Sequence, residues 1–270
     1  MTEIKVMVVD DSPFMRRVIS DIINGQADMK VVATARNGEE ALLAAKRFAP
    51  DVITMDVEMP VMDGLEALQR IMKDNPLPVV MLSSVTKQGA DATVKALHLG
   101  AVDFITKPSG TLSPDINEVA RDIVKKIRIA ALARDKLRLT QVRVDKRIKP
   151  PKVSPAGIDK APEKVILIGT STGGPKALHE VIPKLPGNIP AAVLVVQHMP
   201  PGFTRSLAER INGMSALNVK EAVDGEPVLS GNVYIAPGDY HLKVKRLGEG
   251  LGCRLIIRLT REPLVYGHRP

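Results

Sequence analysis

Strand and helix patterns alternate five times along residues 1–124, and this alternation constrains the fold more than any other feature. Five short apolar runs are separated by segments in which apolar residues recur every three or four positions. The runs are Ile4–Val9, Val31–Ala35, Val52–Met55, Val79–Leu82 and Ala101–Ile105, and the helical segments are Phe14–Ile23, Glu39–Phe48, Leu65–Met72, Ala90–Leu99 and Ile116–Ile127. Such units, joined by short loops, predict an α/β domain whose parallel sheet is covered by helices on both faces.

A second α/β pattern begins behind a proline-rich stretch. The stretch Lys149–Gly157 contains three prolines and one glycine, which is typical of an extended linker. We expect a first domain over residues 1–124, a basic helix tail and linker over 125–163, and a second, doubly wound α/β domain over 164–270. In the second domain the first two strands are expected to be buried. The predicted strands are Lys164–Ile168, Ala191–Gln197, Asn232–Ala236, Leu242–Lys245 and Arg254–Leu259, and the helices are Pro175–Ile182 and Phe203–Ile211.

Charge is distributed unevenly between these three parts. The whole chain has a net charge of +8, whereas residues 1–124, 125–163 and 164–270 carry −5, +8 and +5. Because the linker alone holds as much charge as the chain's net, we interpret the excess as a solvated linker, with docking on an acidic partner as the alternative. We therefore expect no nucleic-acid partner.

The number of cysteines and the expected lack of targeting segments indicate the cellular compartment of the protein. Cys253 is the single cysteine, so no internal disulfide is possible, which suits a reducing compartment. The first residues lack the basic and apolar regions of a signal peptide. No apolar run approaches the ~20 residues that span a bilayer. We expect a soluble, cytoplasmic protein that does not insert into a membrane.

Polar residues follow four of the five strands predicted for the first domain. These residues are Asp10 and Asp11 after the first strand, Asp56 after the third, Ser84 after the fourth and Lys107 after the fifth. The carboxyl ends of parallel strands meet at one edge of a sheet, so these side chains are expected to converge. Three neighbouring carboxylates repel one another unless a cation lies between them. Mg²⁺, which prefers oxygen ligands, suits such a site when it also handles phosphate.

Asp56 is the candidate nucleophile of this site. It ends the central strand and precedes the turn Glu58–Gly64, and a carboxylate can accept a phosphoryl group. The Lys107 ammonium and the Ser84 hydroxyl would then neutralise or hydrogen-bond the phosphoryl oxygens. A lone Asp at a strand end could equally be a helix cap, but five converging residues favour a phosphoryl site.

Residues 1–124 resemble the receiver domain of response regulators. The residues that carry the resemblance are Asp10-Asp11, Asp56, Met59-Pro60, Asp63-Gly64, Ser84 and Lys107-Pro108. The resemblance implies a flavodoxin-like fold with five parallel strands and a histidine kinase as phosphodonor. It implies Mg²⁺ at Asp10, Asp11 and Asp56, with the aspartyl-phosphate at Asp56. It also implies a cis peptide before Pro108, and it assigns the family's switch aromatic to Phe104, which would act through packing.

A glycine-rich turn joins the first strand and first helix of the second pattern. Within Ile168–Lys176, the residues Gly169, Ser171 and Gly173 fit the G-x-S-x-G pattern of a nucleophile elbow. Small residues allow a sharp turn that exposes the Ser171 hydroxyl. The N–H groups of Thr172 and Gly173, at the start of the helix, would bind an oxyanion. The loop could instead cradle a phosphate, although it has neither a dinucleotide glycine triplet nor a Walker lysine.

His198 follows the neighbouring predicted strand, Val193–Gln197. At that sheet edge it could reach Ser171 and act as general base. A lone histidine is more often structural, but one at the same edge as an elbow serine favours catalysis. His241 and His268 are interpreted as ordinary polar residues.

The segments around these two residues resemble the catalytic domain of the chemotaxis protein-glutamate methylesterase, a family that joins this hydrolase-type domain to a receiver in the same order. The matching segments are Gly169–Lys176, Val195–Pro200, Phe203-Thr204, Asp224-Gly225, Val233–Asp239 and Gly267–Pro270. The resemblance implies hydrolysis of glutamate methyl esters, and deamidation of glutamines, on methyl-accepting chemoreceptors. It implies Ser171 as nucleophile and His198 as base. It also implies that the unphosphorylated receiver covers the active site and that phosphorylation relieves this block.

The third residue of that family's triad, an Asp in a later glycine-rich loop, has no counterpart before Pro270. None of Asp224, Glu226 and Asp239 lies in such a motif. Without the acid, the imidazole loses the partner that orients it. We therefore expect a C-terminally incomplete catalytic domain that has little esterase activity by itself.

Two other classes of function remain to be separated from this one. A transcriptional response regulator would also carry a receiver and a basic linker, but it needs a helix-turn-helix, whereas residues 164–270 begin with apolar strands. A docking module, whose inactive output domain binds receptors without hydrolysing them, stays open as the alternative.

Overall fold

The computed structural model describes residues 3–84, 86–107, 116–134, 160–247 and 254–260 of the chain. The chain divides into two compact units, residues 1–146 and residues 147–270. The peptide bond before Pro108 and the segment Gly267–Pro270 lie outside the described residues, so the sequence predictions for them stay predictions.

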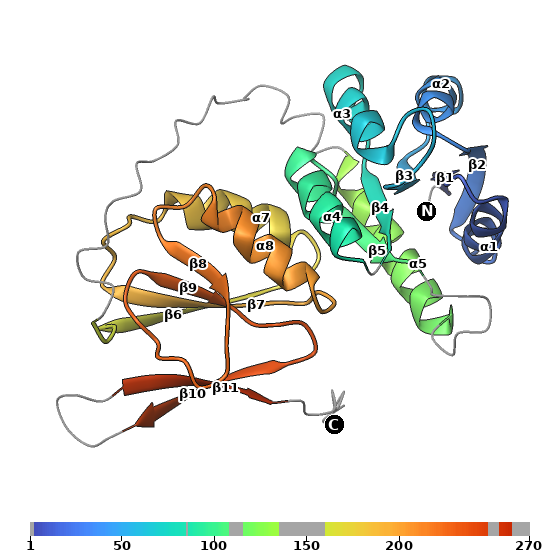
Figure 1. The fold of residues 1–270 in the computed structure, drawn as a ribbon. Coiled ribbons are helices and arrows are strands. Elements are labelled where there is room, and N and C mark those ends of the chain that lie inside the picture. The colour runs from blue at the N-terminus through green and yellow to red at the C-terminus, as the bar shows by residue number, and fades with distance from the viewer. Residues whose placement is uncertain (1–2, 85, 108–115, 135–159, 248–253, 261–270) are drawn as a thin grey trace. The chain divides into compact units, whose positions relative to one another are not determined.

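The first unit is built on a parallel five-stranded sheet with the order β2-β1-β3-β4-β5 (Figure 1). Its strands are β1 Ile4–Val9, β2 Met29–Ala35, β3 Val52–Asp56, β4 Val79–Ser83 and β5 Asp103–Thr106. Its helices are α1 Pro13–Asn24, α2 Gly38–Phe48, α3 Gly64–Asp74, α4 Lys87–Leu99 and α5 Ile116–Leu132. Helix α1 packs beside α5 and α3 beside both α2 and α4, so the sheet has a helical layer on each face. The predicted α/β fold is confirmed.

Four helices of this unit begin with a side-chain cap directly after a strand or loop. Ser12 caps α1, Asn37 caps α2, Asp63 caps α3 and Thr86 caps α4, each by accepting from a backbone N–H in the first turn. Such caps typically contribute about 1 kcal/mol each. They define where each helix starts, and so how far each polar loop extends beyond the sheet.

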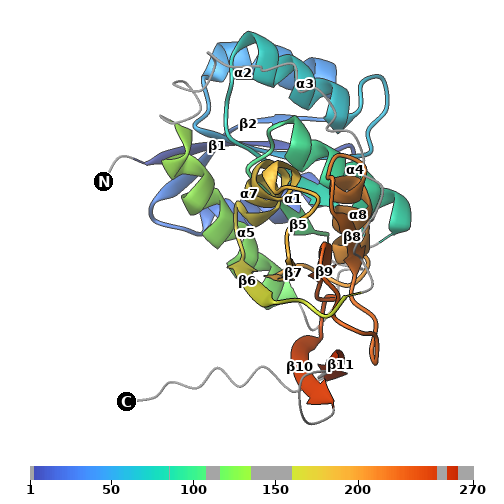
Figure 2. The same cartoon turned by 90° about the vertical axis from the view of Figure 1, so that its left-hand side faces the viewer.

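The second unit contains a parallel four-stranded sheet with the order β6-β7-β9-β8 and an antiparallel pair, β10-β11. The strands are β6 Lys164–Thr170, β7 Ala191–Gln197, β8 Asn218–Glu221, β9 Asn232–Ile235, β10 His241–Leu247 and β11 Arg254–Thr260, and the helices are α7 Gly174–Val181, the 3₁₀ turn η1 Ile182–Lys184 and α8 Phe203–Asn212. Helices α7 and α8 lie on one side of the larger sheet and the β10-β11 pair on the other (Figures 1 and 2). Leu242 of β10 packs against a core cluster that includes Leu194 and Tyr234.

The prediction that the strand at residues 164–168 is buried is wrong. In β6, Val165 is 38% and Leu167 75% exposed, whereas Val193 and Val195 of β7 are fully buried. Among the residues that the structure describes, strand β6 pairs with β7 alone and lies at the edge of the sheet, while β7 has a neighbour on each side. Apolar composition predicts a strand, but it does not distinguish an edge strand from a central one. The sequence analysis also missed β8, which is short and polar.

Candidate functional site

The carboxyl edge of the first sheet gathers three acidic side chains around one lysine. Asp10 follows β1, Asp56 ends β3 and Lys107 follows β5. The Nζ atom of Lys107 lies 2.8 Å from Oδ2 of Asp10 and 2.6 Å from Oδ2 of Asp56. Carboxylate oxygens of Asp10, Asp11 and Asp56 lie within 4.8 Å of one another. The structure thus brings together four of the five residues that the sequence placed at this edge.

Ser84, the fifth residue, lies one position beyond the end of β4. Its hydroxyl forms a hydrogen bond of 3.0 Å with Oγ1 of Thr86. Thr86 in turn caps α4 by accepting from Gly89 N–H at 3.0 Å. Ser84 is therefore at the predicted edge, with its hydroxyl engaged at the start of α4.

Arg16, in the first turn of α1, holds the loop that carries the acidic pair. Its Nη1 atom donates to the carbonyl oxygen of Asp10 at 2.6 Å and to that of Asp11 at 3.0 Å. The N–H of Ser12 donates to Oδ1 of Asp10 at 2.9 Å. Sequence analysis did not select Arg16, because an arginine in a helical turn carries no signal for the carbonyl groups that it contacts.

Gly64 allows the loop after Asp56 to fold back tightly onto the strand. A Cβ atom at Gly64 would lie 1.9 Å from the carbonyl oxygen of Asp56, closer than any side chain tolerates. The N–H of Gly64 donates to the carbonyl oxygen of Val57 at 2.9 Å. The first residue of α3 is therefore packed directly against the end of β3, which explains the glycine in the Asp63-Gly64 motif.

The charges at this edge perturb one another. Burial raises the pKa of Asp56 from 3.8 to about 6, helped by the neighbouring charge of Asp10 and opposed by Lys107 and by the N–H of Glu58. Burial lowers the pKa of Lys107, but the Asp10 and Asp56 carboxylates more than offset it, so the net shift is upward. Lysine stays charged, and three carboxylates against one ammonium leave the edge with excess negative charge. This donor set of oxygens fits a hard divalent cation such as Mg²⁺.

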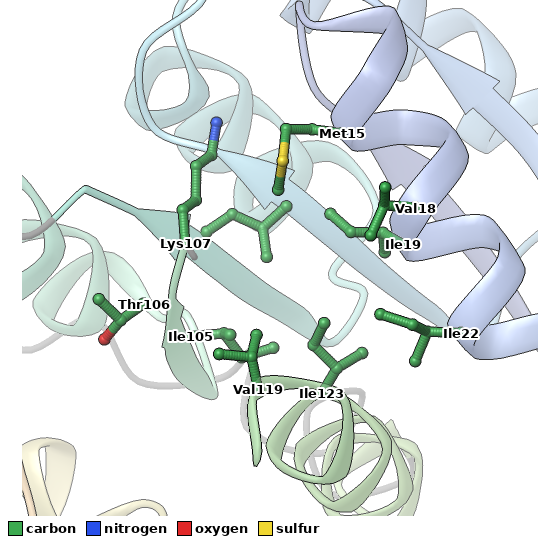
Figure 3. Close-up of a pocket in the computed structure, with 10 residues that line it drawn as sticks. Met15, Val18, Ile19, Ile22, Ile105, Thr106, Lys107, Val119 and Ile123 are labelled. Atoms are coloured by element: carbon green, nitrogen blue, oxygen red, sulfur yellow. The ribbon is translucent and has the colours of Figure 1, made fainter. Parts of the chain in front are cut away.

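Lys107 lies at one end of an apolar pocket. Figure 3 shows Met15, Ile105, Val119 and Ile123 among the residues that line this pocket, and the ammonium of Lys107 points away from Ile105, Val119 and Ile123. The apolar lining comes from α1, β5 and α5. The side chain of Lys107 is 20% exposed. The ammonium at the far end of the side chain forms the ion pairs with Asp10 and Asp56.

The second sheet presents the elbow serine and the candidate base at neighbouring strand ends. Thr170 of β6 pairs with Gln197 of β7, so Ser171 and His198 are the next residues on adjacent strands. The N–H of His198 donates to the carbonyl oxygen of Thr170 at 3.1 Å. Both Ser171 and His198 are exposed. The structure therefore places the predicted nucleophile and base at the same sheet edge.

The turn after Ser171 leads directly into α7. Gly173 has φ of 75°, in the left-handed region that favours glycine, and it precedes α7 without a side-chain cap. The N–H of Gly174 closes the turn by donating to the carbonyl oxygen of Ser171 at 2.8 Å. Thr172 and Gly173, the predicted oxyanion donors, thus lie in the turn between the serine and the helix.

Comparison with known proteins identifies the family. The family model described as CheB methylesterase matches residues 166–270, and that described as response regulator receiver domain matches residues 6–113. A protein-glutamate methylesterase/protein-glutamine glutaminase of Halalkalibacterium halodurans is 51% identical over 269 residues, which are 100% of this chain and 75% of the relative. The chain belongs to this family.

A further relative agrees with this assignment. The corresponding protein 1 of Syntrophomonas wolfei is 51% identical over 98% of this chain and 75% of its own. The crystal structure of the response regulator domain of Thermotoga maritima CheB is 54% identical and covers 48% of this chain and 97% of that chain, with a TM-score of 0.45. Both resemblances noted in the sequence are confirmed at the level of the family. Among the described residues of this methylesterase, no helix is long and apolar enough to cross a membrane.

Gln197, at the edge of the second sheet beside Ser171 and His198, is a residue that the sequence did not single out. Its side chain is buried, and its amide nitrogen donates to the backbone carbonyl oxygens of Ser171 and His198. The available signal was its position, since it is the last residue of β7 and directly precedes His198. A polar residue at the end of a buried strand does not by itself indicate a functional role. Its partners here are backbone carbonyl groups, which the sequence does not reveal.

Proposed function

We propose that this chain is a phosphorylation-regulated methylesterase that hydrolyses glutamate methyl esters, and deamidates glutamines, on chemoreceptors in the cytoplasm. The observation that carries the proposal is the adjacency of Ser171 and His198 at the ends of two paired strands. Membership of the methylesterase/glutaminase family supports the substrate class. A histidine kinase would serve as phosphodonor to the receiver.

Ester hydrolysis would begin at Ser171. Its hydroxyl oxygen attacks the ester carbonyl while His198 takes the hydroxyl proton and later returns it to the departing methanol. The N–H groups of Thr172 and Gly173 stabilise the negative charge that develops on the carbonyl oxygen. Water then releases the acyl group by the same sequence of proton transfers, and glutamine follows this route with ammonia as leaving group.

Phosphoryl transfer would take place at Asp56. Its carboxylate is the acceptor, and the Lys107 ammonium, already 2.6 Å away, would neutralise the transferred group. Ser84 would turn its hydroxyl from Thr86 towards a phosphoryl oxygen. Asp10, Asp11 and Asp56 would hold Mg²⁺, which supplies positive charge to the phosphoryl oxygens when bound.

Two measurements test this proposal. A low rate of methanol release from methylated receptor is expected in the unaltered chain, in which the third triad residue of the family was not found, and this release is expected to disappear in Ser171→Ala. Labelling from acetyl phosphate is expected to occur at Asp56 only, to need Mg²⁺ and to increase the esterase rate. Receptor binding by Ser171→Ala with equal methanol release from both forms would contradict the esterase and favour a docking module.

A further inference from the structure

Gln197 joins the backbone of the proposed nucleophile to that of the proposed base. Its Nε2 atom donates to the carbonyl oxygen of Ser171 at 3.0 Å and to that of His198 at 3.2 Å. Its Oε1 atom accepts from Oγ1 of Thr170 at 2.7 Å. The residue is only 5% exposed, and both amide hydrogens are engaged. The contacts also define which end of the amide is nitrogen, because two carbonyls need a donor and a hydroxyl supplies one.

We propose that Gln197 is a positioning residue for the hydrolysis: its amide orients the Ser171–Thr172 peptide and so aims the N–H of Thr172 at the oxyanion. The inference rests on the proposed function. A peptide unit is planar and trans, so its C=O and its N–H point in opposite directions. Holding the carbonyl of Ser171 against Gln197 therefore turns the N–H of Thr172 away from the protein interior. In a nucleophile elbow, the N–H after the nucleophile is an oxyanion donor.

The packing of the elbow shows why a side chain is needed for this task. A Cβ atom added at Gly169, near the end of β6, or at Gly173, in the turn, would meet no atom within 4 Å among the described residues other than its chain neighbours, so the space beside these two glycines is open. Strand β6, which leads into the turn, is an exposed edge strand. The fixed point of the turn is the carbonyl of Ser171, which accepts from Gly174 N–H and from Gln197.

Gly174 provides the room that the amide occupies. A Cβ atom at Gly174 would lie 2.1 Å from Oε1 of Gln197 and 2.7 Å from Cβ of Thr170. The helix therefore begins close enough to β7 for the glutamine to reach the Ser171 carbonyl, and any larger residue would displace it. The first residue of α7 and the last residue of β7 thus form one unit with the elbow.

The test compares variants that remove the hydrogen bonds donated by Gln197 with one that leaves them in place. Gln197→Glu keeps the size of the side chain and its acceptor for Thr170 but replaces the donor with an oxygen that repels both carbonyls. Gln197→Met removes every hydrogen bond without adding charge. Thr170→Val is the matched control, because it removes the Thr170 contact and leaves both donated bonds in place. Gly174→Ala displaces the amide without altering Gln197.

The rate at which Ser171 reacts with a fluorophosphonate probe reports the oxyanion site directly. In that reaction an Oγ–P bond forms, the P–F bond breaks, fluoride leaves and His198 takes the proton. Losing one oxyanion donor costs about 10²–10³ in rate, so we expect both Gln197 variants and Gly174→Ala to react about 10- to 100-fold more slowly. Reversible affinity for the probe should stay unchanged, and so should the midpoint of the pH profile in Gln197→Met and Gly174→Ala, because these two variants add no charge beside His198. Thr170→Val should lose less than about threefold.

Each outcome separates the two proposals. Absence of labelling at Ser171 in the folded, unaltered protein would contradict the proposed function itself. Normal labelling of that protein with an unchanged rate in Gln197→Glu and Gln197→Met would overturn the positioning role alone. A shifted pH midpoint in Gln197→Met, or an equal loss of rate in Thr170→Val, would also overturn it, because either result means a general disturbance of the site.

A direct measurement covers the case in which these variants fail to fold. In the unaltered protein, NMR should show the two side-chain amide hydrogens of Gln197 exchanging with solvent at least tenfold more slowly than those of Gln26, which donates a single bond of 3.5 Å. Couplings across the hydrogen bonds to the Ser171 and His198 carbonyl carbons should be detectable. Fast exchange and missing couplings would contradict the proposal without any variant.

Discussion

Functional side chains are held differently at two sheet edges: the receiver edge, with Asp10, Asp56 and Lys107, and the elbow edge, with Ser171 and His198. At the receiver edge, the buried side chains of Asp10 and Asp56 are held by the charge of Lys107. At the elbow edge, Ser171 and His198 are exposed, and their backbones are held by neutral hydrogen bonds from a buried amide. Buried charges interact strongly and are costly when a partner is lost, whereas neutral hydrogen bonds mainly define geometry. Mutations at the receiver edge should therefore mainly change the free energy of unfolding, and mutations at the elbow edge should mainly change the rate of ester hydrolysis.

The largest difference between the edges is expected for removal of the proposed nucleophile. Ser171→Ala should lower the already low rate of methyl ester hydrolysis by about 10²-fold, because in hydrolases of this kind loss of the serine costs about that much more than loss of the triad acid. Phosphoryl labelling of Asp56 should be unchanged, and so should the urea midpoint of unfolding, because the serine side chain is exposed. Methanol release within tenfold of the unaltered protein would show that another group is the nucleophile.

Replacing Lys107 tests whether the receiver edge contributes more to the free energy of unfolding than the elbow edge does. Lys107→Met leaves the buried carboxylates of Asp10 and Asp56 without their cation and should lower the free energy of unfolding by about 3–5 kcal/mol in EDTA. The matched change at the elbow, Gln197→Met, should cost about 1–3 kcal/mol. Urea unfolding of both variants measures the difference, and Mg²⁺ should restore part of the Lys107→Met loss. Equal losses at the two edges would contradict the distinction.

The raised pKa of Asp56 makes a prediction with a defined sign. Its pKa is about 6 in the folded protein against 3.8 ordinarily, so folding favours the protonated form. The contribution of this group to stability therefore falls as pH rises from about 4 to 6 and stays low above that range. In EDTA at pH 8, Asp56→Asn should raise the free energy of unfolding by about 1–3 kcal/mol. Urea unfolding at pH 4 should show a much smaller difference, and a destabilised Asp56→Asn at pH 8 would refute the prediction.

The smallest expected difference is that between the stability losses caused by replacing Gly64 and Gly173 with alanine. Gly64→Ala places a Cβ atom against the carbonyl oxygen of Asp56 and should cost about 1–3 kcal/mol of stability, because backbone must move. It should also slow the labelling of Asp56. Gly173→Ala meets open space but keeps a positive φ, which costs about 1 kcal/mol. Thermal unfolding compares the two, and a larger loss at Gly173 would show that conformational strain outweighs the steric contact.

Sequence predicted the convergence at the receiver edge because topology alone brings it about. When parallel strands alternate with helices, each strand ends at the same edge, so Asp10, Asp56 and Lys107 meet whatever the details of packing. The same rule placed Ser171 and His198 on neighbouring strands. The predicted strand ends agree with the structure to within two residues at these positions, because a polar residue or a glycine directly follows each apolar run.

Burial and hydrogen-bond partners were decided by the tertiary structure. The apolar run in β6 predicted a buried strand, but its place at the edge of the sheet leaves Leu167 exposed. The side chains of Arg16 and Gln197 donate to backbone carbonyl oxygens. Every residue has such a carbonyl group, so the sequence does not indicate which one is contacted. Sequence by itself determined the order of the elements and the chemistry at their ends, because strand direction and residue type are local properties. Only the fold decided which backbone groups these side chains hold, because those contacts join residues that are distant along the chain.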